Sequence, residues 1–210
     1  MNSRCSWAKN KIYIEYHDNI WGKILKDEAK MFELLILESQ SVGLSFWQVL
    51  AKKDEYNKYF DFKNPINNLK IQKEDINNIM KNSNLIKNKN KLLSIINNSK
   101  AYLKLKSKYE GLSNFIWNNK EWSSEIGKTN SDDIVKNNTS DKITKILKEF
   151  GFKFIGSITI FSYLQAIGFY YDHQKNCKYY KKIKFYFLRM FLPKYFTNTS
   201  GTVIVPSSFW

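Results

Sequence analysis

The sequence has few of the residues that break or cross-link a chain: three prolines, eight glycines and two cysteines among 210 residues. It has no linker rich in proline and glycine, and its length suits one domain. Two cysteines cannot form a disulfide framework, and 43% hydrophobic residues can build a core without one. No apolar run reaches the roughly 20 residues of a membrane-spanning helix, and residues 1–10 lack a secretory signal pattern. We therefore expect a cytoplasmic protein that does not enter membranes.

Acidic residues are scarce beside basic ones, with 19 Asp and Glu against 34 Lys and Arg, a formal net charge of +15. Such an excess favours a polyanionic partner, with DNA or RNA first and an anionic membrane surface second. Lys and Asn are both abundant, as in proteins from AT-rich genomes, so the charge also has an explanation that needs no partner. Asp172 is the last acidic residue, and part of the excess lies in the basic segment after it.

Helical patterns predominate, and we predict an all-α fold. The expected helices span residues 27–37, 44–52, 73–81, 89–105, 113–118 and 141–150. Thr139 or Ser140 can cap the last of these and Gly151 can end it, while 119–138 is expected to be a loop. Residues 158–161 favour a strand locally, but 156–168 is a long apolar run without a partner strand, so we predict a buried helix there.

The chain has two histidines as well as two cysteines, and each Cys lies near a His. Cys5 precedes His17, and His173 precedes Cys177 by four residues. Two thiolates and two imidazoles make a closed tetrahedral zinc site, which would join the two ends of the domain without an open position for catalysis. The alternatives are four unrelated residues or a Cys5–Cys177 disulfide, which a reduced cytoplasm disfavours.

Glu38 follows a largely apolar stretch. If the helix continues through it, Glu38 lies four residues after Leu34 and three after Leu35, on the apolar face. A carboxylate buried there needs a partner or a function, because an unpaired buried charge costs several kcal/mol. If the helix ends near Leu37, Glu38 is solvated instead. Aromatic residues are dense near the N-terminus, and they are typical of an ordinary core or of walls that stack on an extruded base.

Several short segments, in order along residues 4–177, resemble the bacterial 3-methyladenine DNA glycosylase I family. They are RCSW at 4–7, YIEYHDN at 13–19, WG at 21–22, LE at 37–38, VGLS at 42–45, GFKFIG at 151–156, QA at 165–166 and DH at 172–173. The resemblance implies a helix–hairpin–helix glycosylase that acts on 3-methyladenine in double-stranded DNA. It also implies one structural Zn²⁺ held by Cys5, His17, His173 and Cys177.

The resemblance also assigns residues to the base and to DNA. Glu38 and Tyr16 would recognise the base and support its excision, and the pocket walls would be Phe46, Tyr13, Trp21 and Trp7. Gly43 and Leu44 would fill the gap left by the extruded nucleotide, since an apolar wedge can open a base stack. A hairpin at 84–91 would bind the DNA backbone, and for its phosphate contacts we choose Lys87, Lys89 and Lys91, whose alternative role is solvated surface.

The sequence departs from the family at a few positions. Phe46 stands where the family usually has Trp, Ser41 replaces a common Gln, and Asn84 and Asn90 stand where the hairpin usually has Gly. Asn tolerates a positive φ, so we expect the hairpin turn to be kept. We predict a monomeric glycosylase domain at 1–180 followed by a basic, aromatic extension at 181–210 of unassigned role. The alternative function is a DNA-binding module of the same fold that has lost excision.

Overall fold

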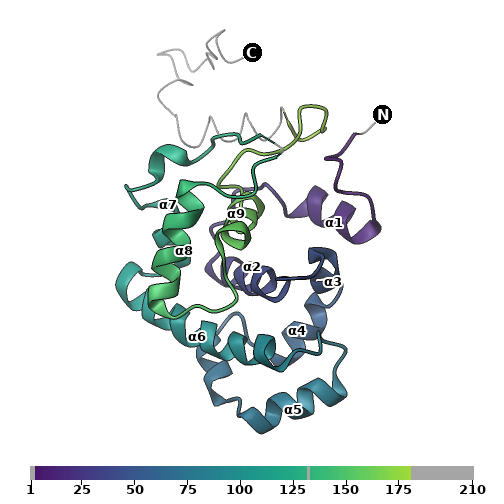
Figure 1. Ribbon diagram of the computed structural model, residues 1–210, viewed down its shortest axis with the longest axis vertical. Helices are drawn as coiled ribbons and strands as arrows, with labels where there is room; N and C mark the ends of the chain where they lie inside the picture. The colour runs from purple at the N-terminus through teal and green to yellow at the C-terminus, as the bar shows by residue number, and fades with distance from the viewer. Residues whose placement is uncertain (1–2, 132, 181–210) are drawn as a thin grey trace, which may run out of the picture.

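The structure, a computed structural model, describes residues 3–131 and 133–180 (Figure 1). In this part of the chain every regular element is a helix, which confirms the predicted all-α class. The elements are α1 (Lys11–Asn19), α2 (Glu28–Gln40), α3 (Phe46–Leu50), α4 (Lys53–Tyr59), η1 (Pro65–Lys70), α5 (Lys73–Asn82), α6 (Lys89–Tyr109), α7 (Leu112–Trp117), η2 (Ser123–Glu125), α8 (Asn138–Phe150) and α9 (Ser157–Ala166). The predicted extension at 181–210 lies outside the described residues.

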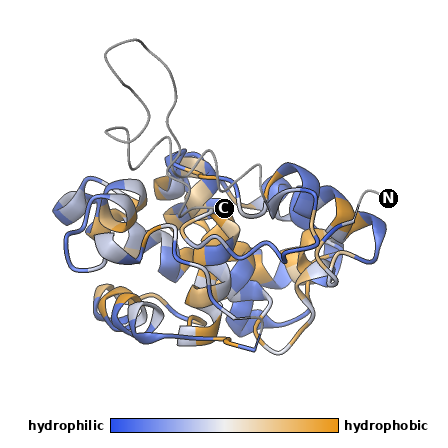
Figure 2. Ribbon diagram, turned by 90° about the horizontal axis from the view of Figure 1, so that it is seen from above, coloured by the Kyte–Doolittle hydropathy of each residue, from blue (hydrophilic) through white to orange (hydrophobic). Residues whose placement is uncertain are grey.

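Helix α2 lies in the middle of the molecule (Figure 1). From Met31 to Gln40 every residue except Glu33 is buried, and a helix that is apolar on nearly all sides belongs in an interior. It packs against α3, α6, α7 and α9. Hydrophobic residues are concentrated toward the middle of the molecule, while hydrophilic ones predominate in the outer helices and loops (Figure 2). The buried residues of these helices form one core, so the C-terminal end of α2 is surrounded by packed elements.

Side-chain caps fix where the site-bearing helices begin. Asn10 accepts a hydrogen bond from the Tyr13 N–H at the start of α1, and Asp27 accepts one from the Lys30 N–H at the start of α2. Such caps satisfy amide groups that the helix leaves without partners. We expected a helix at 27–37, and the observed helix extends three residues further, through Glu38 to Gln40.

Other boundaries differ from the sequence prediction. Helices α1, α4 and η1 were not predicted, and the helix expected at 44–52 covers only Phe46–Leu50. Helix α1 is polar overall and contains the β-branched Ile12 and Ile14, which weaken its helical signal. The long helix expected at 89–105 extends to Tyr109, and the loop expected at 119–138 contains the short η2.

Helix α8 begins earlier than predicted. Its N-cap is Asn137, and Thr139 and Ser140 lie inside the first turn, so the prediction that either caps the helix was wrong. Ser140 instead accepts a hydrogen bond from the Asn137 N–H while the Asn137 side chain accepts one from the Ser140 N–H, which is a reciprocal capping box. Gly151 ends the helix with a φ of 102°, as predicted.

The segment with strand-favouring residues is a helix, α9, as predicted. Ile160 and Phe161 are buried against the core while Ile158 is exposed, so tertiary packing overrides the local preference. Among the described helices, none is both long and apolar enough to cross a membrane.

Candidate functional site

Helix α1 carries three of the predicted site residues on one side. Tyr13, Tyr16 and His17 are three and four residues apart, the spacing that brings side chains onto the same helix face. Tyr16 and His17 are buried, whereas Tyr13 is half-buried. Tyr13 and Tyr16 line a cavity, and His17 belongs to a cluster of Cys and His side chains that could hold a metal ion, so one short helix joins two parts of the site.

Aromatic rings in edge-on contact form the walls of this cavity. Trp7 lies 5.0 Å from Trp21 and 5.5 Å from Tyr13, measured between ring centroids, and Tyr16 lies 5.4 Å from Phe46. The Tyr13 hydroxyl also accepts a 3.2 Å hydrogen bond from the backbone N–H of residue 47. Edge-to-face pairs hold rings in defined positions, so the walls are preorganised before any ligand enters.

Glu38 is the acidic residue of the cavity and is only 6% exposed. Because α2 continues past it, the carboxyl lies on the buried face, and the solvated alternative is wrong. No hydrogen bond to its carboxyl is found among the described residues. Burial raises the pKa of Glu38 to about 8, because the charged form loses its hydration without gaining a partner. A buried, unpaired carboxyl of this kind is a candidate for ligand recognition.

Tyr16 offers a second unsatisfied polar group. Its hydroxyl is buried and has no hydrogen-bond partner among the described residues. Burial, and after it the nearby Glu38, raise the pKa of Tyr16 well above its ordinary value, so the hydroxyl stays protonated and able to donate. Glu38 and Tyr16 therefore give the cavity one ionisable acceptor and one neutral donor.

The cavity has a volume of about 350 Å³, which suits a purine base. We call it the base pocket, after the role that the sequence resemblance implies. It is lined by Trp7, Tyr13, Tyr16, Trp21, Glu38, Ser41, Leu44, Phe46, Ser162 and Gln165. The structure thus brings together all six predicted recognition and wall residues, which are scattered over the first 46 positions of the chain.

Ser162 and Gln165 complete the base pocket, and sequence analysis did not predict them as site residues. They lie three residues apart on α9, so they share a face of that helix. The Gln165 amide donates a 2.8 Å hydrogen bond to Asp172. Two polar residues at this spacing inside a mostly apolar helix are the signal that could have identified them.

The loop from Ser41 to Leu44, which we call the wedge loop, follows α2 at the edge of the base pocket. The Leu44 N–H donates a 2.7 Å hydrogen bond to the Ser41 carbonyl, and Gly43 has a φ of 76°, a conformation that favours glycine. Val42 and Leu44 are 41% and 39% exposed. Exposed apolar side chains on a tight turn beside a pocket are suited to enter a base stack.

The three lysines chosen in the hairpin at 84–91 have different surroundings. Lys89 is exposed. Lys87 is exposed too, but its ammonium donates hydrogen bonds to the carbonyls of Met80 and Ser83 at the end of α5. Lys91 is buried, and its ammonium donates to the carbonyls of Gln40 and Val42. The choice of Lys91 as a phosphate contact is therefore corrected: its charge faces the protein interior.

The hairpin turn is also built differently from the expectation. Neither Asn84 nor Asn90 has a positive φ; the non-glycine residues with positive φ in the described chain are Glu110 and Phe154. Asn84 is held instead by Lys52, whose ammonium donates a 3.0 Å hydrogen bond to its side-chain oxygen, and by Glu55, which accepts from its N–H. The hairpin turn is therefore held by side-chain contacts from α4 and the residue before it, and it does not need a residue with positive φ.

Cys5, His17, His173 and Cys177 come together in a buried cluster that could hold a metal ion. Their ligand atoms all lie within 4.8 Å of one another. The Nδ1 atom of His173 is 3.5 Å from each sulfur, and the Nε2 atom of His17 is 3.4 Å from the Cys177 sulfur. Neither cysteine is in a disulfide, so the structure does not support the disulfide alternative.

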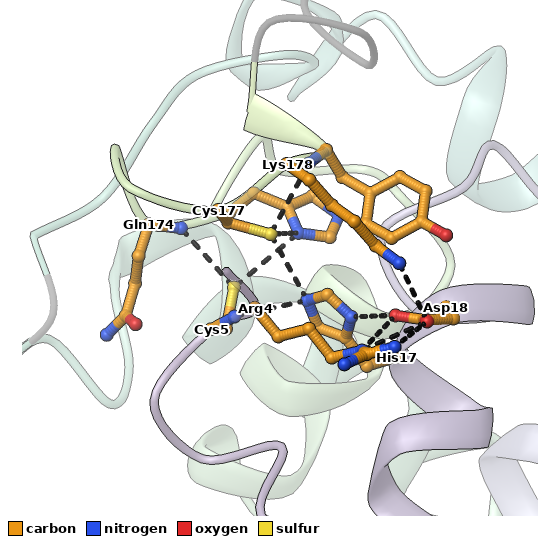
Figure 3. A network of polar contacts seen from close by, with 9 residues as sticks. Arg4, Cys5, His17, Asp18, Gln174, Cys177 and Lys178 are labelled. Atoms are coloured by element: carbon orange, nitrogen blue, oxygen red, sulfur yellow. Dashed lines mark hydrogen bonds and ion pairs between the residues drawn. The ribbon is translucent and has the colours of Figure 1, made fainter. Parts of the chain in front are cut away.

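Charged residues support this cluster from outside (Figure 3). The Asp18 carboxylate lies 2.9 Å from Nδ1 of His17, on the far side of the ring from the cluster. Arg4 and Lys178 both donate to the same carboxylate, at 2.8 and 2.9 Å. The Arg4 guanidinium, with His17 and Lys178, holds the pKa of Asp18 far below its usual range. A carboxylate behind a histidine orients the ring and fixes its tautomer, as in many metal sites.

The cluster and the base pocket share a wall. Trp21, which lines the pocket, lies 4.8 Å from the ring of His173 and is stacked at 6.1 Å on His17. Trp7 lies 5.2 Å from His17. Gly22 has a φ of 71°, and a Cβ there would lie only 2.6 Å from Nε2 of His173, so a glycine lets the chain pass this ring. The positions of the two tryptophans therefore depend on the two histidines.

An all-helical fold with an aromatic pocket, a buried carboxyl and a neighbouring wedge loop defines a protein that can bind a single extruded base. Residues 6–181 match the methyladenine glycosylase family. DNA-3-methyladenine glycosylase 1 of Escherichia coli is 34% identical over 177 residues, covering 83% of this chain and 95% of the relative. The DNA-3-methyladenine glycosylase of Haemophilus influenzae is 38% identical over 181 residues, covering 84% and 97%.

Solved structures agree with these sequence relatives. The 3-methyladenine DNA glycosylase I from Staphylococcus aureus, solved to explain its recognition of 3-methyladenine, superposes with a TM-score of 0.76 at 36% identity. The match covers 85% of this chain and 96% of that one. The chain belongs to the methyladenine glycosylase family, which confirms the resemblance found in the sequence.

Proposed function

We propose that this protein releases 3-methyladenine from double-stranded DNA by hydrolysing its N-glycosidic bond after the nucleotide has turned out of the helix. The observation that carries the proposal is the buried, unpaired Glu38 at the base pocket. Methylation at N3 gives adenine a positive charge, and such a cation is the partner that this carboxyl lacks. Pairing with the cation favours the charged form of Glu38, whose pKa burial raises to about 8.

Discrimination against normal adenine follows from the same carboxyl. A neutral base offers no charge to offset a desolvated carboxylate, so it gains little from the pocket. Tyr16, whose hydroxyl is buried without a partner, can donate a hydrogen bond to a base in the pocket, and Phe46 can stack on it. Glu38 and Tyr16 are the proposed recognition and catalytic residues, with Tyr13, Trp21 and Trp7 as further walls.

The proposed reaction needs little catalytic assistance from the protein beyond recognition of the base. A cationic base is already a good leaving group, so the bond to the sugar is weak before binding. Among the described residues that line the base pocket, Glu38 is the only acidic one. We propose that excision relies on extrusion, on the charge of Glu38 and on access of water. The wedge loop, with Gly43 and Leu44, would fill the gap in the base stack.

A base-release assay tests this function. Duplex DNA treated with a methylating agent is incubated with the protein, and the released bases are separated and identified. We expect free 3-methyladenine and no release of adenine. Binding to the DNA without release of any methylated base would favour the alternative, a binding module that has lost excision.

Replacing Phe46 with Trp should increase excision. A larger ring attracts a cation more strongly, by about 0.5–1 kcal/mol, which corresponds to a roughly 2- to 5-fold gain. We expect kcat/KM for release of 3-methyladenine to rise by about this factor. Trp47→Phe is the matched control, because Trp47 is exposed and lies outside the base pocket. An unchanged or lower kcat/KM for Phe46→Trp would show that Phe46 does not stack on the base.

The hairpin at 84–91 is the proposed grip on the DNA backbone, and its lysines should contribute unequally. Removing a lysine that neutralises one phosphate lowers the slope of log affinity against log salt by about 0.9. We expect this decrease for the exposed Lys89→Ala and no decrease for Lys91→Met, because the Lys91 ammonium faces carbonyls. Binding titrations at several salt concentrations measure the slopes. Equal decreases for both variants would restore Lys91 as a phosphate contact.

We propose that the Cys5, His17, His173 and Cys177 cluster holds one structural Zn²⁺. In a tetrahedral site with zinc about 2.3 Å from sulfur and 2.0–2.1 Å from nitrogen, sulfur and nitrogen ligands lie about 3.5 Å apart. Three sulfur–nitrogen distances in the cluster are 3.4–3.5 Å and all four ligand atoms lie within 4.8 Å of one another, so the residues fit the ion. Bound there, zinc would link the N-terminal segment to residues 173–177 and take no part in the reaction.

Every residue of the proposed site comes from one chain, and we propose that the protein acts as a monomer. Its two buried cysteines form no disulfide, which suits a reduced compartment and favours the cytoplasm. We keep residues 1–180 as the glycosylase domain and assign no role to the extension at 181–210.

A further inference from the structure

Lys91 lies in the first turn of α6 and is only 6% exposed. Its ammonium donates hydrogen bonds of 2.8 Å to the carbonyl of Gln40 and 2.7 Å to the carbonyl of Val42. Among the described residues no carboxylate forms an ion pair with it. A lysine is rarely buried without such a partner, because desolvation opposes its charge and here lowers its pKa. The hydrogen bonds to these two carbonyls are therefore the interactions that hold the buried ammonium in place.

The contact is reciprocal. The Gln40 side-chain amide donates back to the Lys91 carbonyl at 3.0 Å and to the Ser94 hydroxyl at 3.3 Å. Gln40 is the last residue of α2, where the helix dipole favours a positive charge. The end of α2 and the start of α6, about 50 residues apart in sequence, are thus joined by hydrogen bonds in both directions.

The joined segments carry the two parts of the protein that must act together on DNA. Val42, which accepts from Lys91, belongs to the wedge loop and immediately precedes Gly43 and Leu44. On the other side, Lys91 ends the hairpin at 84–91, two residues after the exposed Lys89. A shift of the Val42 carbonyl would move Leu44 relative to the hairpin.

We propose that Lys91 is a positioning residue that fixes the wedge loop relative to the DNA-binding hairpin, so that Leu44 enters the base stack when the hairpin holds the backbone. This inference rests on the proposed function. Lys91 touches neither base nor phosphate in this role; it acts through the backbone of Val42. The base pocket itself does not include Lys91, so binding of a free base should not depend on it.

The test compares Lys91→Met, which keeps the aliphatic stem, with Lys100→Met, an exposed lysine on the same helix. We expect single-turnover release of 3-methyladenine from duplex DNA to fall at least tenfold for Lys91→Met and to stay unchanged for Lys100→Met. Calorimetric affinity for free 3-methyladenine should change less than about twofold. Unstacking next to the lesion, followed with a fluorescent base analogue, should decrease with the excision rate. An equal decrease in affinity for the free base would show that Lys91→Met disturbs the base pocket as well, and it would overturn the proposal. Unchanged excision from duplex DNA would also overturn it.

A double-mutant cycle with Leu44→Ala tests whether Lys91 acts through the wedge. Adding Lys91→Met to Leu44→Ala should lower excision by less than threefold, because the wedge is already gone. Full additivity of the two effects would overturn the proposal. Should Lys91→Met not fold, Lys91→Gln, which removes the ammonium and keeps a polar side chain, must show the same contrast between duplex and free base. If the wild-type protein itself releases no 3-methyladenine, the proposed function fails, and the unstacking measured with Lys91→Met still tests whether Lys91 positions the wedge loop.

Discussion

Glu38→Gln should lose at least 100-fold in the rate of 3-methyladenine release and should fold more stably than the wild-type protein at high pH. Gln cannot carry the negative charge that a cationic base needs as its partner, yet it fills the same volume. Removing an interaction with a charged partner in a buried site commonly costs about 3 kcal/mol or more, which corresponds to over 100-fold.

The gain in stability follows from the buried carboxyl. The pKa of Glu38 is about 8 in the folded protein, against an ordinary value of 4.5. Between these values the folded state binds more protons than the unfolded state, so stability falls as pH rises from about 4.5 to about 8. The full difference corresponds to about 5 kcal/mol, and relaxation around the charge leaves about 2–4 kcal/mol. Gln does not ionise and avoids this loss.

Thermal unfolding at pH 5, 7 and 9 measures the effect. For a protein of this size, about 2–4 kcal/mol raises Tm by roughly 5–15 °C, and the advantage of Glu38→Gln should appear only as pH increases. Glu15→Gln on α1 is the matched control, since Glu15 is exposed and lies beside the buried Tyr16. A variant that excises normally would falsify the role of Glu38, and a Tm difference independent of pH would contradict its raised pKa.

The sequence alone could not show whether Glu38 is buried, because its burial depends on where α2 ends. The spacing from Leu34 and Leu35 put the carboxyl on an apolar face only if the helix continued. Ser39 and Gln40, both polar, gave no reason to extend it. In the structure both residues are buried: Ser39 donates to the Ile36 carbonyl within α2, whereas α6 supplies the partners of Gln40, which donates to the Lys91 carbonyl and to Ser94. Such a contact spans about 50 residues, and no local pattern reveals it.

The burial of Lys91 could not be predicted from the sequence either. In sequence it is one of several lysines in a basic hairpin, and its neighbours Lys87 and Lys89 have the same charge. Only the fold separates the buried ammonium of Lys91 from the exposed one of Lys89. Composition and motif correctly predicted the class of the protein, and they picked out the Cys and His residues and the aromatic residues that the structure brings together, because those are marked by rare residue types. They could not predict the orientation of common ones.

Removing the proposed zinc should lower Tm by about 10–20 °C and weaken base binding. The four ligands join residue 5, α1 and residues 173–177, and without an ion their buried thiols and imidazoles lose their common partner. Zinc-finger peptides gain about 10–16 kcal/mol from zinc. This domain has a large core of its own, so we expect about 5 kcal/mol, which gives this range of Tm. Metal analysis of the purified protein should find about one zinc per chain.

The effect on the base follows from the shared wall. Trp21 and Trp7 line the base pocket and rest on the rings of His17 and His173. When the histidines are released, both tryptophans should become mobile, which tryptophan fluorescence and calorimetric titration with 3-methyladenine can follow together. Cys177→Ser serves as the control for the chelator. This variant lacks one proposed zinc ligand, so its Tm should already be low and should change little when the chelator is added. If the protein contains no metal, and if the chelator changes neither its Tm nor its fluorescence, the zinc proposal is wrong and the cluster is an ordinary part of the core.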